Sequence, residues 1–316
     1  MEAAATAPHA AGETAYGLIG DKIYVAGGIS ESPSAGPAIV TATQVYDTTT
    51  NTWSTDGAPN PYNLAGTGVA LDGKLYDIGG LSLSTFQLTP DVSVYDPATN
   101  AWTQAAPYPL ALNYAQCGAI DGKIYCTGGA GQQESDESFV YNPASNSWSR
   151  FASVPGFQNA SAFGVANGEL ILSGGTTGVD ATDLTNGVLA YNPERNWWVP
   201  LPSLPAPEYF GQAAQGFYEI SGTQDDGPVT AASVLSGYDS ASPVKLPWLS
   251  TNTTTVTLRP HQSVTITVRL NAKAADLSRP STLIASLGFE TDTPYSPAAI
   301  PVSLTVLPAR TGGNAD

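Results

Sequence analysis

The sequence predicts an all-β protein in which a repeat domain is followed by a small β-sandwich, and three observations lead to this fold class. Only 12% of the residues are charged, while 32 glycines and 25 prolines supply many turns, a composition that favours short strands over long helices. One pattern recurs along the first three quarters of the chain. The remainder alternates apolar and polar residues, as strands with one buried face do.

The repeat is carried by four similar segments, VYDTTTNTW, VYDPATNAW, VYNPASNSW and AYNPERNWW, which end at Trp53, Trp102, Trp148 and Trp198. Each follows an apolar stretch that ends in a glycine pair: IYVAGG, LYDIGG, IYCTGG and LILSGG. A weaker fifth copy reads FYEISG and continues to Tyr238. The repeat tyrosines are 49, 46, 50 and 47 residues apart. The chain therefore contains five copies of one structural unit.

Each unit holds four short apolar stretches, enough for one four-stranded blade of a β-propeller. In the third unit these are Tyr114–Ile120, Lys123–Gly128, Ser138–Asn142 and Ser147–Arg150. The first two stretches are joined by the pair DG, and the other units have GD, DG or NG there, which favours two-residue hairpins. In the repeat motif, the Asp or Asn after the tyrosine closes an Asx-turn, while Tyr and Trp supply buried area between blades. We expect this motif to be architectural.

These motifs resemble the kelch family over residues 8–242, since kelch repeats have a period of about 50 residues. The resemblance implies a kelch β-propeller over residues 1–242 with five recognisable blades, or an incomplete set of six. Kelch propellers usually have six or seven, and the last copy here lacks a clear outer strand. The first residues, TAPHAAGETAYG, resemble the start of a unit. We therefore expect the chain to begin at a blade boundary, as a fragment of a longer parent would.

Residues 243–316 are predicted to form the sandwich and a short C-terminal tail. The stretches TTTVTLRP, QSVTITVRL, STLIASLGF and AIPVSLTVL alternate with period two, which indicates strands with one buried face. Over residues 243–310 this segment resembles the small bacterial immunoglobulin-like modules that follow catalytic or binding domains in exported proteins. His261 stands where such modules usually have glycine, and we interpret it as a turn residue.

The two cysteines, Cys117 and Cys126, flank the hairpin turn of the third unit symmetrically. Pairing the strands from the turn outward places them directly opposite each other at a non-hydrogen-bonded site, with Cα atoms about 4.5 Å apart. A disulfide at this site would contribute about 2–3 kcal/mol to stability and would indicate an oxidising compartment. The alternative is a pair of buried free thiols.

Charge and composition exclude several partners. The formal net charge is −16, from 27 acidic and 11 basic residues, and this field repels nucleic acid and anionic membranes. No apolar run is long enough for membrane insertion. The chain has two histidines, His9 and His261, too few for a copper site resembling that of galactose oxidase, a histidine zinc site or a Ser-His-Asp triad in the propeller. We predict no cofactor and no metal: the carboxylates at Glu134, Asp136, Glu137, Asp180 and Asp183 do not follow a calcium-loop pattern.

The topology of a blade predicts two different faces. The turns between first and second and between third and fourth strands lie on one face, which we call the turn face. The second-to-third loops and the inter-blade segments lie on the other, the loop face, and these loops are long and varied: 29–42, 81–91, 130–137 and 176–187. Long, diverse loops indicate a recognition surface. Candidate ligand-binding aromatics there are Tyr62, Phe86, Tyr108, Phe157 and Tyr209, although such residues also pack loops.

Three functions are compatible with these features. The first is a non-catalytic, secreted binding module that recognises a polysaccharide or an extracellular protein through the loop face. The second is an accessory region of an exported hydrolase, because the domain order resembles the C-terminal part of secreted bacterial subtilisin-family proteases; the catalytic domain would then lie upstream in the parent chain. The third is a carboxylate-based enzyme acting on sugars at the propeller axis, which requires two converging acidic side chains.

Overall fold

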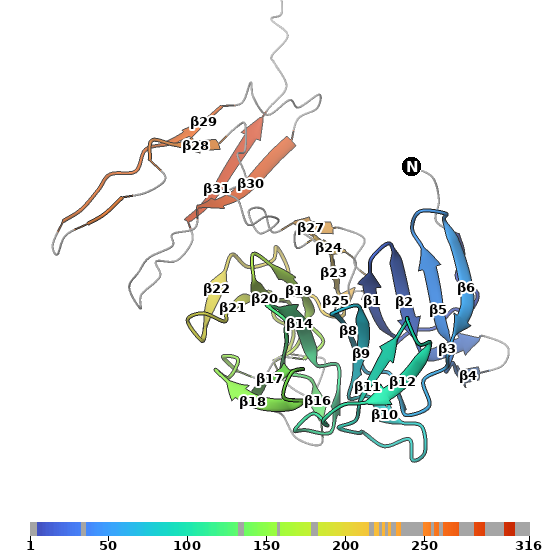
Figure 1. Cartoon of the computed structure of the whole chain (residues 1–316). Coiled ribbons are helices and arrows are strands. Elements are labelled where there is room, and N and C mark those ends of the chain that lie inside the picture. The colour runs from blue at the N-terminus through green and yellow to red at the C-terminus, as the bar shows by residue number, and fades with distance from the viewer. Residues whose placement is uncertain are drawn as a thin grey trace, which may run out of the picture. The chain divides into compact units, whose positions relative to one another are not determined.

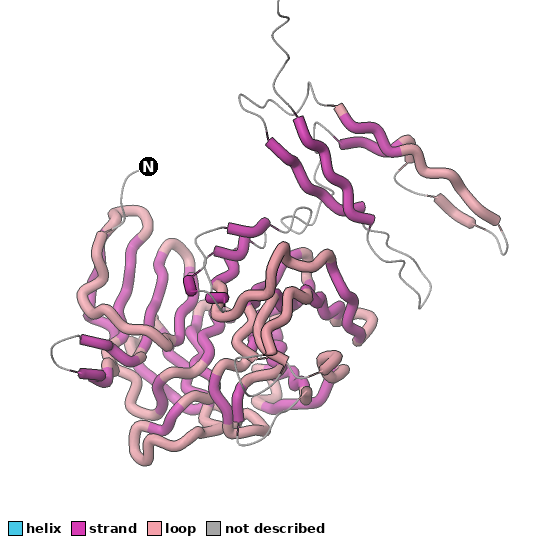
Figure 2. Tube along the Cα trace, turned by 180° about the vertical axis from the view of Figure 1, so that it is seen from behind, coloured by secondary structure: helices cyan, strands magenta, loops and turns pink. Residues whose placement is uncertain are grey.

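A computed structural model describes residues 5–32, 36–131, 136–156, 159–177, 183–214, 218–220, 223–224, 227–228, 232–234, 249–253, 256–258, 262–271, 281–287 and 300–306. All secondary structure in these residues is β-strand (Figures 1 and 2), so they include no helix that could cross a membrane. The chain divides into two compact units, Met1–Val234 and Leu235–Asp316. The boundary expected after residue 242 lies outside the described residues.

The first four repeats each form a four-stranded antiparallel sheet, or blade, with the strands in chain order. Blade one consists of β1 (Ala15–Ile19), β2 (Lys22–Ala26), β5 (Thr43–Asp47) and β6 (Thr52–Gly57), and blade two of β8 (Thr67–Leu71), β9 (Lys74–Ile78), β11 (Val92–Asp96) and β12 (Ala101–Gln104). Blade three consists of β14 (Gln116–Ile120), β15 (Lys123–Thr127), β17 (Ser138–Asn142) and β18 (Ser147–Phe151). Blade four consists of β19 (Ala162–Ala166), β20 (Glu169–Ser173), β21 (Val188–Asn192) and β22 (Trp197–Leu201).

The fifth repeat forms a three-stranded sheet of β23 (Gln212–Ala214), β24 (Tyr218–Ile220) and β27 (Ala232–Val234). The innermost strands β1, β8, β14, β19 and β23 contact one another in succession. In Figure 1 they gather at the centre of the unit, while β6, β18 and β22 lie at its periphery. The described residues thus contain four complete blades and a fifth, three-stranded sheet. Tyr238, which was expected in that fifth unit, lies outside the described residues.

Short additional strands lie on the loop face. They are β3 (Ile29–Ser32), β4 (Gly36–Ile39), β7 (Asn63–Leu64), β10 (Leu81–Ser82), β13 (Leu112–Asn113), β16 (Ala130–Gly131), β25 (Thr223–Gln224) and β26 (Gly227–Pro228). Four of them tie the start of a second-to-third loop to the segment that enters the same blade, because β7 pairs with β10 and β13 with β16. Isolated bridges join Gly12 to Ile29 and Asn159 to Thr176 in the same way, whereas β3 pairs with β4 and β25 with β26. The loop face is therefore held by backbone pairing where it approaches the axis.

The repeat motif fastens each blade to the preceding segment of the chain. In blade two, Asn100 Oδ1 accepts hydrogen bonds from Tyr95 OH (2.7 Å) and the Ala58 amide (2.7 Å). Trp102 Nε1 donates to the Ala58 carbonyl (2.8 Å). The other three motifs make the same contacts with Ala5, Ala106 and Ala152. The motif is architectural, as the sequence predicts.

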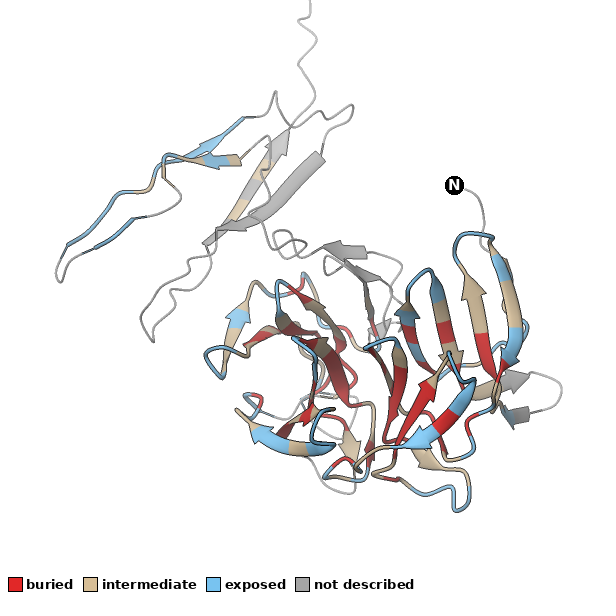
Figure 3. Cartoon of the chain, viewed as in Figure 1, coloured by how far each residue is buried: buried red, intermediate tan, exposed pale blue. Residues whose placement is uncertain are grey.

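The segments that lead from one blade to the next, here called straps, have a common pattern of burial. They comprise residues 58–66, 106–115, 152–161 and 202–211, and residues 5–14 lead into blade one in the same way. The third residue of each of the four inter-blade straps is buried: Asn60, Tyr108, Val154 and Leu204. Figure 3 shows that burial is concentrated in the inner strands, while outer strands such as β12 and β18 are largely exposed. The core therefore lies between blades and beneath the straps.

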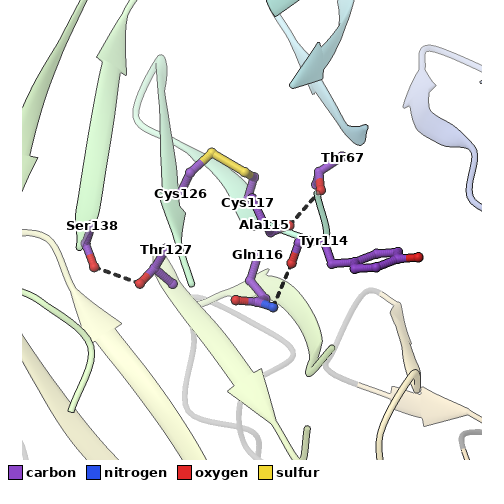
Figure 4. The surroundings of a disulfide bond; sticks show 8 residues. All are labelled: Thr67, Tyr114, Ala115, Gln116, Cys117, Cys126, Thr127 and Ser138. Atoms are coloured by element: carbon purple, nitrogen blue, oxygen red, sulfur yellow. Dashed lines mark hydrogen bonds between the residues drawn. A yellow bond between two sulfur atoms is a disulfide. The ribbon is translucent and has the colours of Figure 1, made fainter. Parts of the chain in front are cut away.

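The disulfide joins Cys117 and Cys126 in blade three (Figure 4). The strand register pairs these residues directly, with Ala119 opposite Ile124 and Gly118 opposite Tyr125, which is the predicted register. The Cα atoms lie 4.2 Å apart, and both cysteines belong to the core cluster between blades two and three. The bond lies in the interior of the propeller.

The second unit shows two antiparallel hairpins. β28 (Leu249–Thr251) pairs with β29 (Val268–Leu270), and β30 (Ser281–Leu287) pairs with β31 (Ile300–Val306). The predicted immunoglobulin-like sandwich is not evident here. Apolar side chains on the first hairpin and its extension are exposed: Val256, Leu258, Val264, Val268 and Leu270. The alternation of apolar and polar residues in the sequence therefore corresponds to strands. In the described residues, however, no second sheet covers the apolar side chains of the first hairpin.

Candidate functional site

Five equivalent residues mark the place where the chain reaches the propeller axis. Glu13, Ala65, Tyr114, Ala160 and Phe210 all have a left-handed backbone, with φ between 52° and 59°. Each directly precedes a small residue and the innermost strand of its unit. We call them the mouth residues. A left-handed conformation is uncommon outside glycine and persists only where the surrounding structure imposes it, often at functional sites.

The glycine pairs help to impose this conformation. The second glycine of each pair lies against the backbone on either side of the mouth residue of its own blade. A Cβ atom at Gly129 (φ 96°) would lie 2.8 Å from the Asn113 carbonyl oxygen and 3.1 Å from the Ala115 amide nitrogen, which flank Tyr114. At Gly80 it would overlap the Leu64 carbonyl, next to Ala65. Only glycine permits this close approach.

A cavity of about 480 Å³ lies at the mouth, within the range of small-molecule sites. All five units contribute to its wall, which consists of Glu13, Thr14, Tyr16, Ala65, Gly66, Thr67, Gly68, Tyr114, Ala160, Ser161, Phe163, Phe210 and Gly211. These residues lie at the N-terminal ends of the innermost strands. Because the glycine pairs and the long loops follow the second strands, which run the opposite way, this end of the axis is on the loop face.

Three mouth residues contact one another across the axis. Tyr114 OH donates a hydrogen bond to Glu13 Oε1 (2.9 Å), and the rings of Tyr114 and Phe210 meet edge to face with centroids 5.7 Å apart. Burial, together with the Glu13 carboxylate, raises the pKa of Tyr114 to about 12. Tyr114 therefore remains a hydrogen-bond donor to Glu13 throughout the neutral range. Phe210 and Tyr16 are 49% and 43% exposed and present aromatic surface at the cavity.

A buried polar network lies behind the cavity wall in blade two. The Asp77 side chain is fully buried and accepts a hydrogen bond from Asn60 Nδ2 (2.9 Å) through Oδ2. Asn63 Nδ2 donates to the Gly79 carbonyl (2.7 Å), and Ser93 Oγ donates to Asn63 Oδ1. Burial raises the pKa of the Asp77 carboxyl well above its usual range. Gly66 separates this acid from the cavity, because a Cβ atom there would overlap Asp77 Oδ1.

The structure places the predicted recognition aromatics in different environments. Tyr108 is 1% exposed and stacks edge to face with Phe139 and Trp148, so its prediction as a surface ligand contact is wrong. The physical reason is its strap position, since Val154 and Leu204 are buried at the equivalent place. Phe157 lies outside the described residues.

The other three predicted aromatics remain candidates to different degrees. Phe86 is 51% exposed at the tip of the second long loop. Tyr62 is half-buried against the cluster between blades one and two, and Tyr209 is half-buried with its ring 4.9 Å from that of Phe210. The cavity wall includes none of these three residues. Their contribution to binding stays a prediction.

Sequence reasoning missed Tyr114 and Phe210 as members of the site. Figure 4 shows the Tyr114 ring extending away from the Cys117–Cys126 disulfide. The available signal was positional: an aromatic residue followed by a small residue, immediately before the first strand of a unit. Tyr108 is the third residue of its strap, a position that is buried in all four inter-blade straps. Tyr114 and Phe210 instead stand next to the last residue of their straps.

The acidic residues considered for calcium do not form a metal site in the described part of the chain. No group of three or more potential ligands occurs there. Glu137 forms an ion pair with Arg150, while Glu134 and Asp180 lie outside the described residues, as does His261. The His9 backbone binds Gln44 through its amide (2.8 Å) and its carbonyl (3.1 Å), which holds the first strap onto blade one.

Comparison with known proteins agrees with the repeat pattern. Residues 111–155 match the family model "Kelch motif". The chain is 37% identical over 123 residues to the Kelch-like protein terF of Aspergillus terreus, an alignment covering 37% of this chain and 27% of that protein. It is 36% identical over 111 residues to the Kelch-like ECH-associated protein 1A of Danio rerio, covering 34% of this chain and 17% of that protein. The chain thus spans about a quarter or less of the length of these relatives.

A solved structure shows the fold more completely. The protein described as "Structure of YjhT" superposes with a TM-score of 0.59 at 18% identity, covering 70% of this chain and 80% of that chain. At this identity the match concerns the fold alone. The motif match and the Kelch-like relatives show that part of this chain is similar to kelch-repeat proteins.

Proposed function

We propose that this chain is a non-catalytic, secreted binding module that recognises an extracellular protein or a polysaccharide through the loop face of its propeller. The observation that carries the proposal is the axial cavity, which residues of all five units line at the loop-face end of the axis. Its wall combines aromatic surface with a few polar groups, the usual composition of a ligand site. Kelch-repeat propellers are typically protein-binding modules, which favours a protein partner.

Secretion is part of this proposal and is supported by two features. The chain has a disulfide and no other cysteine, and disulfides persist in oxidising compartments. The sequence pI is about 4.2, and a low content of basic groups limits self-repulsion when carboxylates are protonated in an acidic medium.

The experiment is a binding screen of the full chain against a polysaccharide array and against bacterial culture supernatant. Phe210→Ala and Phe86→Ala each remove an exposed aromatic from the loop face, at the mouth and at a loop tip. Trp197→Ala on outer strand β22 removes an aromatic away from that face and serves as the matched control. We expect a captured ligand to be lost with Phe210→Ala and retained with Trp197→Ala. Equal retention by all three variants would contradict recognition through the loop face.

A second proposal, the accessory region of a secreted subtilisin-family protease, depends on the sequence resemblance of residues 243–310 to modules of exported proteins. Its test is the reading frame upstream of this chain in the parent gene, where a protease domain is expected. The third possibility, a carboxylate-based sugar enzyme, requires two acidic groups in one pocket. Among the described residues that line the cavity, Glu13 is the single carboxylate, so this arrangement does not favour catalysis.

A further inference from the structure

We propose that the axial cavity binds an alkylammonium group, with Glu13 as its counter-ion and the rings around the mouth as its cation–π surface. This inference rests on the proposed binding function and deepens it by assigning a ligand chemistry. Two ligand sources share this chemistry: the side chain of a lysine in a protein partner and a free amine.

The cavity wall carries negative charge. Glu13 is the one ionisable acid among the described wall residues, and these residues include no Lys, Arg or His. The Tyr114 hydroxyl donates to Oε1, which fixes the carboxylate across the axis and leaves its other acceptor sites open. Glu13 is solvent-exposed and no partner cation is described beside it. An incoming ammonium group supplies the donors that this carboxylate lacks, whereas a carboxylate or phosphate ligand would be repelled.

Aromatic side chains lie beside that charge. Tyr16, Tyr114, Phe163 and Phe210 come from four different units and line the same cavity. Phe210 lies edge to face with Tyr114, which is bonded to Glu13, so carboxylate and ring surface form one continuous wall. A carboxylate with neighbouring aromatic faces is the arrangement that recognises organic cations, since the ring faces are electronegative. An uncharged sugar could stack on the rings, but it would not form an ion pair with the carboxylate.

A ligand that approaches the cavity meets the electrostatic field of the whole propeller unit. Residues 1–234 contain 22 acidic and 5 basic side chains, a formal charge of −17, so the propeller unit accounts for the chain's net charge of −16. The lysines of this unit, Lys22, Lys74 and Lys123, are the first residues of second strands and therefore lie on the turn face. Arg195 lies in the turn between β21 and β22 on the same face, and Arg150 is ion-paired with Glu137.

The loop face is acidic as well and carries fewer cations. Asp91, Asp136 and Glu137 stand at the ends of its long loops, Asp183 lies within one, and Glu13 stands at its centre. On the turn face Lys22 and Lys74 are paired with the acids Asp47 and Asp96, so the cations of the unit are mostly held by turn-face acids, away from the cavity. Such a field attracts cations to the mouth and repels anions.

The experiment uses the full chain and three small probes: n-butylammonium, butyrate as its anionic counterpart of similar size, and an acetylated, amidated lysine dipeptide. Binding is followed by ligand-observed NMR and by calorimetric titration at low ionic strength. We expect butylammonium to bind in the millimolar range, which suits a ligand of so few atoms, and butyrate not to bind. The comparison of the two ions needs no variant, so it does not depend on how a mutant folds.

Variants then locate the binding. Glu13→Gln keeps the size and the acceptor for Tyr114 but removes the charge, and we expect it to weaken butylammonium binding about fivefold. Phe210→Leu is expected to weaken it about threefold by removing a ring face. Glu194→Gln makes the same change of charge in the turn before β22, on the turn face, and should leave the affinity unchanged.

The outcomes separate this inference from the proposed function. Tighter binding of the lysine dipeptide than of butylammonium identifies a protein side chain as the source, and the reverse order identifies a free amine. Equal binding of butylammonium and butyrate, or an equal loss in Glu13→Gln and Glu194→Gln, would overturn the ammonium assignment. If a ligand from the array or supernatant still requires Phe210 in that case, the loop-face function stands and only its proposed chemistry fails.

Discussion

The buried acid Asp77 gives the propeller a pH-dependent stability that a single substitution should remove. Its side chain is fully buried, and burial raises its pKa well above the usual value, so the folded protein keeps this carboxyl protonated to a higher pH than the unfolded chain does. In the unfolded chain the same carboxyl ionises near its ordinary pKa of about 3.9. Between that pH and the folded-state pKa, folding requires the uptake of one proton at this site.

The sign and size of the effect follow from this difference in bound protons. Between the unfolded and the folded pKa the native state binds one proton more than the unfolded state, so the free energy of unfolding falls by about 1.4 kcal/mol for each pH unit as pH rises. The stabilising contribution is complete below the unfolded pKa and is lost as the pH rises through the folded pKa. Asp77→Asn removes the titration and retains an oxygen that accepts from Asn60. The variant should therefore gain stability relative to the wild type by about 1.4 kcal/mol per pH unit.

The assay is urea unfolding followed by tryptophan fluorescence between pH 5 and pH 7. Five of the six tryptophans lie in residues 1–234, so the signal reports mainly on the propeller. Asp56→Asn is the control, because Asp56 is exposed on β6 and its substitution should shift stability equally at both pH values. Parallel loss of stability in the wild type and Asp77→Asn across this range would refute a protonated Asp77 in the folded state.

Two further predictions test the architecture. Gly80→Ala should destabilise the propeller by more than about 2 kcal/mol, because Gly80 has φ 84° and the new methyl group would overlap the Leu64 carbonyl. The control Gly73→Ala (φ 73°) has nothing within 4 Å of the added Cβ and should lower the free energy of unfolding by only about 1 kcal/mol. Equal losses of stability in urea unfolding would argue against the close approach at Gly80. Replacing Cys117 and Cys126 by serine should remove about 2.6 kcal/mol of stability, the chain-entropy value for a loop with a sequence separation of 9. Reduction of the wild type should give a similar loss, and an unchanged unfolding midpoint after verified reduction would contradict it.

Much of the blade architecture could be predicted from the sequence because its signals are local. A two-residue turn such as Asp121-Gly122 fixes the register of its hairpin, and that register placed Cys117 opposite Cys126. The repeat motif likewise combines residues within one blade with the nearest preceding strap. These contacts repeat with the period of the sequence, so the period alone reveals them.

The candidate site required the tertiary structure because its members are not equivalent in residue type. Glu13 and Tyr114 are 101 residues apart, and they meet only because five inner strands converge on one axis. The mouth positions are occupied by an acid, two alanines and two aromatics, so no motif marks them. Tyr108 shows the opposite case. Its residue type suggested a surface anchor, whereas its position in the strap is buried and places it in the core. The sequence by itself determined the strands, turns and inter-blade contacts of this protein, since these depend on neighbouring residues. The cavity and its charge depend on side chains from separate blades, and only the folded propeller brings those together.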